Sequence, residues 1–108
     1  MANTFTSYAA KNVGTSASTL VTVAAATQTT VIGITVANTS AASITVDVYV
    51  TRSAVDYYVI KGASVPVGRS FVPVGGDQKL VLITGDALKV VSSAATSADV
   101  IASVLNIT

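Results

Sequence analysis

One stretch of strict alternation constrains this chain more than any other feature. Between positions 44 and 51 an apolar set, Ile44, Val46, Val48 and Val50, alternates with a polar or amphipathic set, Thr45, Asp47, Tyr49 and Thr51. A period of two residues is the pattern of a half-buried β-strand, because successive side chains point to opposite faces. We predict that the apolar set lies in the core. The Asp47, Tyr49 and Thr51 face is expected to meet a second sheet edge, a partner subunit or solvent.

A second alternating run, Ile32, Ile34 and Val36, precedes this strand. Between the two runs, Asn38-Thr39-Ser40 supplies short polar side chains that favour a reversal of the chain. Residues 34–52 are therefore predicted to form a β-hairpin at the centre of an all-β domain.

Further runs of strand-forming residues recur about every ten residues, with turn residues between them. Gly33 indicates a bulge or a close backbone approach, and Gly85-Asp86 indicates a tight turn into a return strand. The 79–84 run, KLVLIT, is apolar on both faces, which predicts a central strand or one covered by a partner subunit. The expected strands are 19–25, 28–37, 43–52, 56–61, 70–72, 79–84, 87–92 and 99–107.

This spacing predicts an antiparallel β-sandwich, jelly-roll or immunoglobulin-like, of about seven or eight strands. Residues 19–108 are expected to form this single domain, and residues 1–18, which show no sustained alternation, an extended N-terminal arm. Phe5 and Tyr8 are the large side chains of the arm. They are expected either to dock on a neighbouring molecule or to fold back on their own domain. The 62–77 segment is rich in Gly and Pro, so the strand at 70–72 is placed at a sheet edge.

The composition argues against an enzyme. The 108 residues include no His, Cys or Glu, and the five Asp residues are dispersed. Nucleophilic and acid/base catalysis usually needs His, Cys or paired carboxylates, and metal sites need clustered ligands. We therefore predict no catalytic residue, no metal and no cofactor. Asp86 is expected to accept hydrogen bonds from turn amides, and Gly75-Gly76-Asp77 is read as a turn because no helix follows it, as a phosphate loop requires.

The low charge indicates association with other proteins. Only 10% of the residues are charged, the net charge is +1, and the Lys and Arg residues are scattered. A basic stripe for nucleic acid is therefore missing from the sequence. No apolar run is long enough to cross a membrane, and the first residues lack a secretory signal, so use without export from the cytoplasm is expected. A surface with so few charges suggests burial against copies or partners, and the alternative is a soluble β-domain whose surface carries hydroxyl groups instead of charges.

Aromatic and arginine side chains are the predicted partner contacts, since these residue types are enriched at interfaces. Tyr49, Tyr57 and Tyr58 also leave open a different class of function, a carbohydrate-binding module in which exposed tyrosine rings stack on sugars. The full set of candidate contacts is Phe5, Tyr8, Tyr49, Arg52, Tyr57, Tyr58 and Arg69.

Three segments carry a resemblance to a known group. They are ITVANTSAASITVDVYVTR, YYVIKGASVPVG and KLVLITGDALKVVSSAATSADVIASVLNIT, within 31–108. In this order they resemble small virion structural proteins of tailed bacteriophages, especially of cyanophages and related marine phages. The most telling motifs are the hairpin-like LITGDALKV at 82–90 and the final SVLNI at 103–107.

The resemblance implies a non-enzymatic β-sandwich subunit located in the virion and assembled in the host cytoplasm. It implies either a capsid cement (decoration) protein or a component of the tail, neck or fibre attachment. The implied partners are copies of the chain, with a trimer favoured, and the major capsid protein or other virion proteins.

Overall fold

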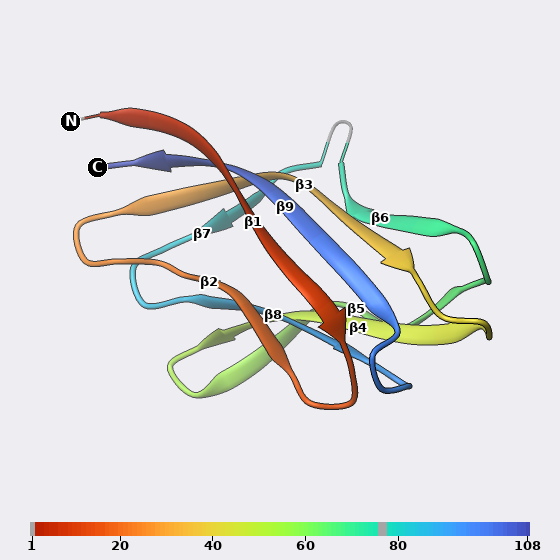
Figure 1. The fold of residues 1–108 in the computed structure, drawn as a ribbon. Coiled ribbons are helices and arrows are strands. Elements are labelled where there is room, and N and C mark those ends of the chain that lie inside the picture. Colours follow the sequence, from red (N-terminus) through yellow and green to blue (C-terminus); the bar gives the residue numbers. More distant parts are fainter. Residues whose placement is uncertain (1, 76–77) are drawn as a thin grey trace.

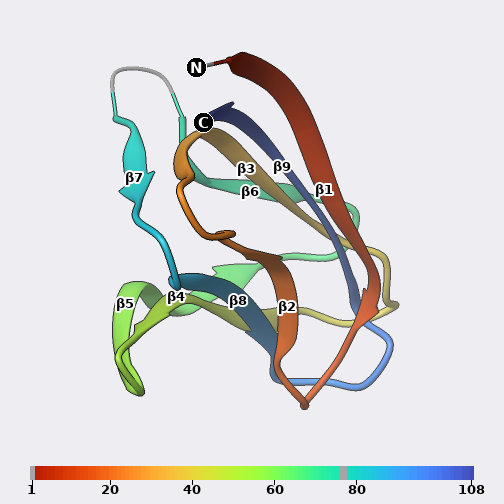
Figure 2. The same ribbon diagram turned by 90° about the vertical axis from the view of Figure 1, so that its left-hand side faces the viewer.

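The computed structural model describes residues 2–75 and 78–108, which form an all-β sandwich of two antiparallel sheets (Figures 1 and 2). The predicted fold class is therefore confirmed. The first sheet has the order β1 (Asn3–Val13), β9 (Ala98–Ile107), β3 (Gln28–Asn38) and β6 (Ser70–Val74), and β7 (Leu80–Leu82) also pairs with β3. The second sheet has the order β2 (Ser18–Thr22), β8 (Ala87–Ser92), β4 (Ile44–Arg52) and β5 (Val55–Val65).

The strand pairs are nested along the chain. β1 pairs with β9, β2 with β8, β3 with β6, and β4 with β5, while β3–β9 and β4–β8 pairs complete each sheet. A long hairpin rolled up on itself produces this order, which is that of a jelly roll of two sheets. Of the two topologies expected from the sequence, the structure has the jelly roll, with β7 as an additional short strand between β6 and β8.

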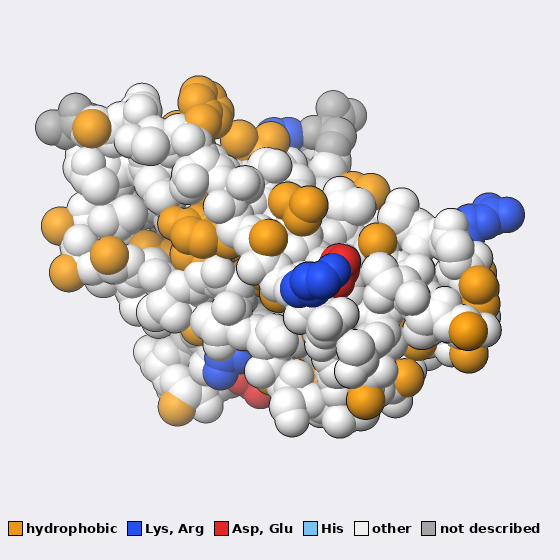
Figure 3. Space-filling view, in the orientation of Figure 1, with side chains coloured by type: hydrophobic (Ala, Val, Ile, Leu, Met, Phe, Trp, Pro, Cys, Tyr) orange, Lys and Arg blue, Asp and Glu red, His pale blue; other side chains and the backbone are white. Residues whose placement is uncertain are grey.

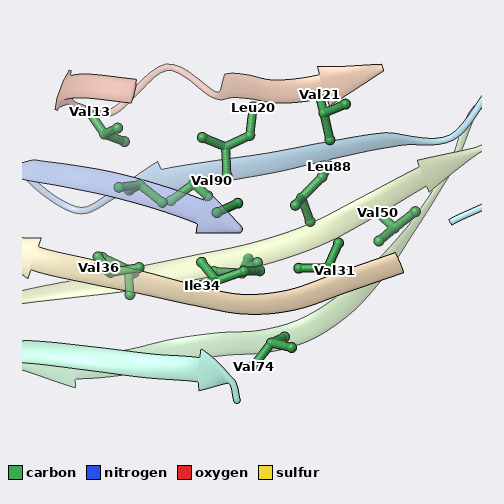
Figure 4. Packing of buried hydrophobic residues seen from close by; sticks show 14 of the residues in the cluster. Val13, Leu20, Val21, Val31, Ile34, Val36, Val50, Val74, Leu88 and Val90 are labelled. Carbon is green, nitrogen blue, oxygen red and sulfur yellow. The ribbon is translucent and has the colours of Figure 1, made fainter. Parts of the chain in front are cut away.

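The core is a valine-rich layer between the two sheets (Figure 4). The alternating set of β4 contributes as predicted, because its four apolar side chains are at most 6% exposed. Opposite them, Val31, Ile34 and Val36 of β3 are fully buried. Burial of a Val, Leu or Ile side chain contributes about 1.5–3 kcal/mol each, so this layer is the main source of stability.

The prediction of a hairpin over residues 34–52 is wrong. β3 and β4 lie in different sheets, and the connection after Asn38 crosses from one layer to the other. The Asn38 side chain, 6% exposed, holds this crossing: its Nδ2 donates to the carbonyls of Ala42 (2.8 Å) and Val65 (2.9 Å), and its Oδ1 accepts from the Ser40 amide (2.9 Å). Short polar residues stabilise any reversal, and they do not specify which sheet the next strand joins.

The same is true of the turn at Gly85-Asp86. A tight turn is present, with φ of +91° at Gly85 and a hydrogen bond from the Asp86 amide to the Ile83 carbonyl (3.0 Å). However, β7 and β8 on either side of it belong to different sheets, so β8 is not the return strand of a hairpin.

The tight hairpin of this chain joins β4 and β5. Arg52 pairs with Val55, which leaves Ser53 and Ala54 as a two-residue loop with φ of 52° and 62°. Positive φ at both central positions is the geometry of a type I′ turn, whose twist matches that of the strands. β5 also continues past its predicted end at Gly62, where φ is +71° and the amide donates to Asp47 Oδ1 at 2.7 Å.

The structure corrects the expected place of residues 3–13. They are extended, yet they form β1 at the edge of the first sheet, in register with β9 from Asn3 opposite Ile107 to Ala10 opposite Val100. Residues 3–13 are therefore part of the sandwich, and the described residues form nine strands. The N- and C-terminal ends lie side by side (Figure 1), joined by mutual backbone hydrogen bonds between Ala2 and Thr108.

Two smaller predictions are confirmed, and one of the two alternatives for residues 79–84 is wrong. The register of β3 against β9 shifts between Val31 and Gly33, which is the predicted bulge, and β6, with its proline, is at an edge of its sheet. β7 is a three-residue edge strand with Val81 57% exposed, so the central-strand alternative for residues 79–84 is wrong, and coverage of this strand by a partner subunit stays a prediction. The turn predicted at Gly75-Gly76-Asp77 falls partly outside the described residues. Within the described part of the chain, no helix is long and apolar enough to span a membrane.

Candidate functional site

A groove of about 490 Å³ is lined by residues of β5 and β7, which belong to different sheets. Both strands lie on the left-hand side in Figure 2. Its walls combine aliphatic, aromatic and polar side chains. It brings together three of the candidate contacts, Arg52, Tyr57 and Tyr58. The other lining residues are Val50, Val59, Gln78, Leu80, Val81 and Leu82.

Arg52 and Asp86 form an ion pair at one wall of this groove. Arg52 Nε donates to Asp86 Oδ1 at 2.8 Å, and Arg52 Nη2 donates to Oδ2 at 2.6 Å. The Ile83 amide also donates to Oδ2 at 2.9 Å, so the carboxylate accepts from the turn as predicted and, in addition, from the end of β4. Asp86 is 1% exposed, while the Arg52 side chain is 43% exposed.

This pairing sets the charge of the groove. The Arg52 hydrogen bonds hold the pKa of the Asp86 carboxyl below its usual 3.8, and the Ile83 amide adds to the effect against the opposing cost of burial. The same hydrogen bonds raise the pKa of Arg52. Both groups are therefore ionised at neutral pH, and their charges cancel, so the groove is suited to an uncharged ligand rather than to an anion.

Tyr49 is covered by its own sheet. It is 9% exposed, and it lies in register between Tyr58 of β5 and Lys89 of β8. The Tyr49 and Tyr58 ring centroids are 5.0 Å apart, and Lys61 Nζ lies 4.4 Å from the Tyr58 centroid. Burial, with Asp56 as the next cause, raises the pKa of Tyr49 above its usual 10.0.

Tyr57 is the candidate with an available ring. It is 58% exposed and lines the groove. Tyr58 is 46% exposed, but its ring already contacts Tyr49 and Lys61. Of the three tyrosines suggested as a sugar platform, the structure therefore leaves Tyr57 in a position to offer a free face, and Tyr49 is too buried to do so.

The two aromatic residues of β1 differ in role. Phe5 is 74% exposed. Tyr8 is half-buried against the core, and its hydroxyl accepts from Asn106 Nδ2 at 3.2 Å, so it folds back on its own domain. Arg69 is exposed in the turn before β6, where its backbone bonds to Pro66 and Asn38, and it lies outside the groove.

The remaining described Asp side chains satisfy local backbone and side-chain donors. Asp56 accepts from the Thr51 hydroxyl at 2.7 Å. Asp99 accepts from the Asn12 amide at 3.0 Å and from Lys11 at 3.3 Å, and the first of these holds the pKa of Asp99 below its usual 3.8. Among residues 2–75 and 78–108, no three carboxylates gather in a group that could bind a metal ion.

No family model matches this chain, and no curated protein shows significant similarity to it. The resemblance to phage virion proteins therefore stays a prediction.

The surface is poor in charge and carries large apolar side chains. Figure 3, which shows the side on which β1 lies in front, has few charged side chains among uncharged polar and hydrophobic ones. The large hydrophobic residues that are 45–74% exposed come from both sheets, from the turn before β6 and from the connection between β7 and β8. They are Phe5, Val55, Tyr57, Tyr58, Val67, Val72, Val81, Ile83 and Ile101.

Proposed function

We propose that this chain is a non-enzymatic structural subunit of a bacteriophage virion, an oligomeric jelly-roll domain that cements or decorates the capsid shell. The alternative within this proposal is a subunit of the tail, neck or fibre attachment, which would use the same surfaces of the domain for its contacts. The jelly roll is an architecture of viral capsid domains. Because one fold hosts many functions, this agreement supports the proposal only by analogy.

The observation that carries the proposal is the character of the surface. Exposed Phe, Tyr, Val and Ile side chains stand on a chain in which 10% of the residues are charged. A free monomer normally keeps both signs of charge on its surface for solubility, whereas aromatic side chains such as Phe5 and Tyr57 are enriched at protein interfaces. This surface is suited to burial against copies of the chain and against a capsid protein.

Reconstitution with virus particles tests the proposal. Purified protein, a trimer in our expectation, is mixed with capsid shells that lack it, and co-sedimentation with the shell is measured. A variant with a charge on the exposed apolar surface, Ile101→Asp, should bind more weakly, and Thr45→Asp, also exposed but on β4 of the second sheet, is the control for added charge. Protein that stays monomeric and binds neither shells nor tails would contradict the proposal.

The groove supports a second candidate, a carbohydrate-binding module. The groove offers features that suit a neutral sugar. The exposed Tyr57 ring can stack on it, the side chains of Gln78 and Arg52 can form hydrogen bonds, and the Arg52–Asp86 ion pair has no net charge. A volume near 490 Å³ lies in the range of ligand pockets.

A screen on a glycan array tests this candidate with Tyr57→Ala and, as the control outside the groove, Val67→Ala. Selective loss of a bound sugar in Tyr57→Ala supports the module. Absence of any bound sugar, or unchanged binding in Tyr57→Ala, excludes the tyrosine mechanism.

A further inference from the structure

Strand β1 has one free edge, and the backbone pairing shows which of its groups face that edge. Ala2 and Thr108 exchange both backbone hydrogen bonds, at 3.2 and 3.0 Å. The register then continues without a shift from Asn3 to Ala10. Since hydrogen-bonded pairs alternate along an antiparallel ladder, the even-numbered residues of this stretch bond to β9. The amides and carbonyls of Asn3, Phe5, Ser7 and Ala9 therefore point away from β9, towards the free edge.

This edge lacks the features that normally prevent edge-to-edge association. Residues 3–10 contain no charge, no proline and no glycine, and their register has no bulge. The side chains of residues 3–7 and of Ala9 are exposed, and Tyr8 between them is half-buried. The first charged residue of the strand, Lys11, is already paired with Asp99 at 3.3 Å.

The other edge strands of the described residues are protected. β2 has five residues and a register shift, and β7 has three residues. β6 contains Pro73, while β5 contains Asp56 and Lys61 and changes register against β4. Charge, proline, bulges and shortness are the known ways to block strand addition, so β1 is the edge that is open to it.

We propose that β1 pairs with β1 of a second copy, antiparallel across a two-fold axis, so that two first sheets become one continuous sheet. In a two-fold antiparallel pair each residue of one copy faces a residue whose number differs from its own by an even amount. The free-edge amides and carbonyls belong to the odd-numbered residues Phe5, Ser7 and Ala9, so those of the two copies face each other. With Ser7 opposite Ser7 of the second copy, Phe5 lies opposite Ala9. No like charges meet in this pairing, whereas they would destabilise cross-strand pairs.

The inference deepens the proposed assembly function, on which it rests, by naming one contact and its partner. A two-fold contact joins subunits in pairs. In a particle it would therefore link one trimer to the next rather than close the trimer.

Proline at position 7 tests the pairing. In Ser7→Pro the missing amide hydrogen belongs to the free edge, so no hydrogen bond to β9 is lost, and an edge strand tolerates proline in that orientation. Ser7→Ala, which keeps the amide, is the matched control. By sedimentation equilibrium we expect Ser7→Ala to self-associate as the natural chain does, and Ser7→Pro to dissociate at least about tenfold more readily.

Two further measurements keep the test decisive if Ser7→Pro fails to fold. Ser7→Lys adds a charge at an exposed position of the edge and is expected to weaken association in the same way. Hydrogen exchange of the natural chain should show the Phe5, Ser7 and Ala9 amides gaining protection as concentration rises, while the Thr6 and Tyr8 amides are protected at every concentration.

The outcomes separate the pairing from the proposed function. If the natural chain shows no gain of protection at odd positions, or if Ser7→Pro and Ser7→Lys associate as strongly as Ser7→Ala, the β1 pairing is wrong even where the protein binds capsid shells. If β1 pairs as described but no virion particle is bound, the pairing stands and the virion function fails.

Discussion

Replacing Arg52 by Met should destabilise the chain strongly and in a way that depends on pH. Met keeps an unbranched apolar stem in the groove wall and removes the guanidinium group. Asp86, 1% exposed, then retains the Ile83 amide as its donor and loses both charge-assisted bonds from Arg52. The buried carboxylate is left without a counter-charge, which is the costly way to break an ion pair.

Substitution of Arg52 should lower the free energy of unfolding more than substitution of Asp86. Removal of one member of a buried pair costs about 3–5 kcal/mol, and because the Arg52 side chain is 43% exposed we expect the lower end, about 3 kcal/mol, for Arg52→Met. In Asp86→Asn the shape is kept and Arg52 can turn to water, so a loss of about 1–2 kcal/mol is expected. The Arg52→Met loss corresponds to a Tm lower by about 12 °C.

Urea unfolding at pH 7 and at pH 3 is the assay. The folded pKa of Asp86 is depressed, so the stability it contributes is present above its usual 3.8 and is lost as the pH falls through the lower folded value. In Arg52→Met this depression is relieved, so the gap in stability between the natural chain and the variant should narrow below about pH 4. An equal gap at both pH values, or a greater loss in Asp86→Asn than in Arg52→Met, would refute this reasoning.

Two further substitutions test the local geometry. Ala54→Gly should stabilise the chain by about 0.5–1 kcal/mol, because φ of 62° is costly for a residue with a Cβ atom. Ala9→Gly, at a position of β1 where φ is not positive, is the control in urea unfolding and should destabilise. Asn38→Ala should cost about 2–3 kcal/mol, because it leaves the Val65 carbonyl without its donor. A thermal melt of Asn38→Ala within about 1 °C of the natural chain would show that the crossing loop does not depend on this amide.

Alternation along the chain was enough to predict the strands that line the core. On β4 the contrast between Val48 and its polar neighbours is strong, and the structure buries Val48 completely. On β1 no such contrast exists, since Phe5 is exposed on one face while Thr4 and Thr6 occupy the other. Pairing with β9 determines that this segment is a strand, and β9 begins only at Ala98, too far along the chain for a local pattern to indicate the pairing.

The connections between strands were harder to predict than the strands. Asn38 is as suitable for a crossing between layers as for a hairpin, because in both cases its side chain satisfies nearby backbone groups. The tight hairpin lies instead at Ser53-Ala54, a pair that lacks the Gly or Asn typical of positive φ. The expected strands 43–52 and 56–61 leave a short loop around these two residues, as observed, but no sequence signal indicated its type I′ geometry.

The candidate site was predicted in part. Arg52, Tyr57 and Tyr58 were selected as interface residue types, and the structure places them at one groove. The pairing of Arg52 with Asp86 spans 34 positions and follows from the meeting of β4 with the turn after β7. The β7 residues that complete the groove were predicted as part of an apolar strand over 79–84, but not as part of a site, and Gln78 carried no signal, because an isolated polar side chain has no distinctive spacing.

The nested pairing of strands has a consequence for how the chain folds. The β4–β5 pair closes over a two-residue loop, whereas the β1–β9 pair joins Asn3 to Ile107. Pairing of segments so distant in sequence is slow, because a large loop must be ordered before any contact is gained. During synthesis β1 leaves the ribosome before the other described strands, yet it stays without a partner strand until β9 emerges. The interval before β9 arrives is therefore the period in which the uncharged edge of a new chain is most exposed to association with other chains.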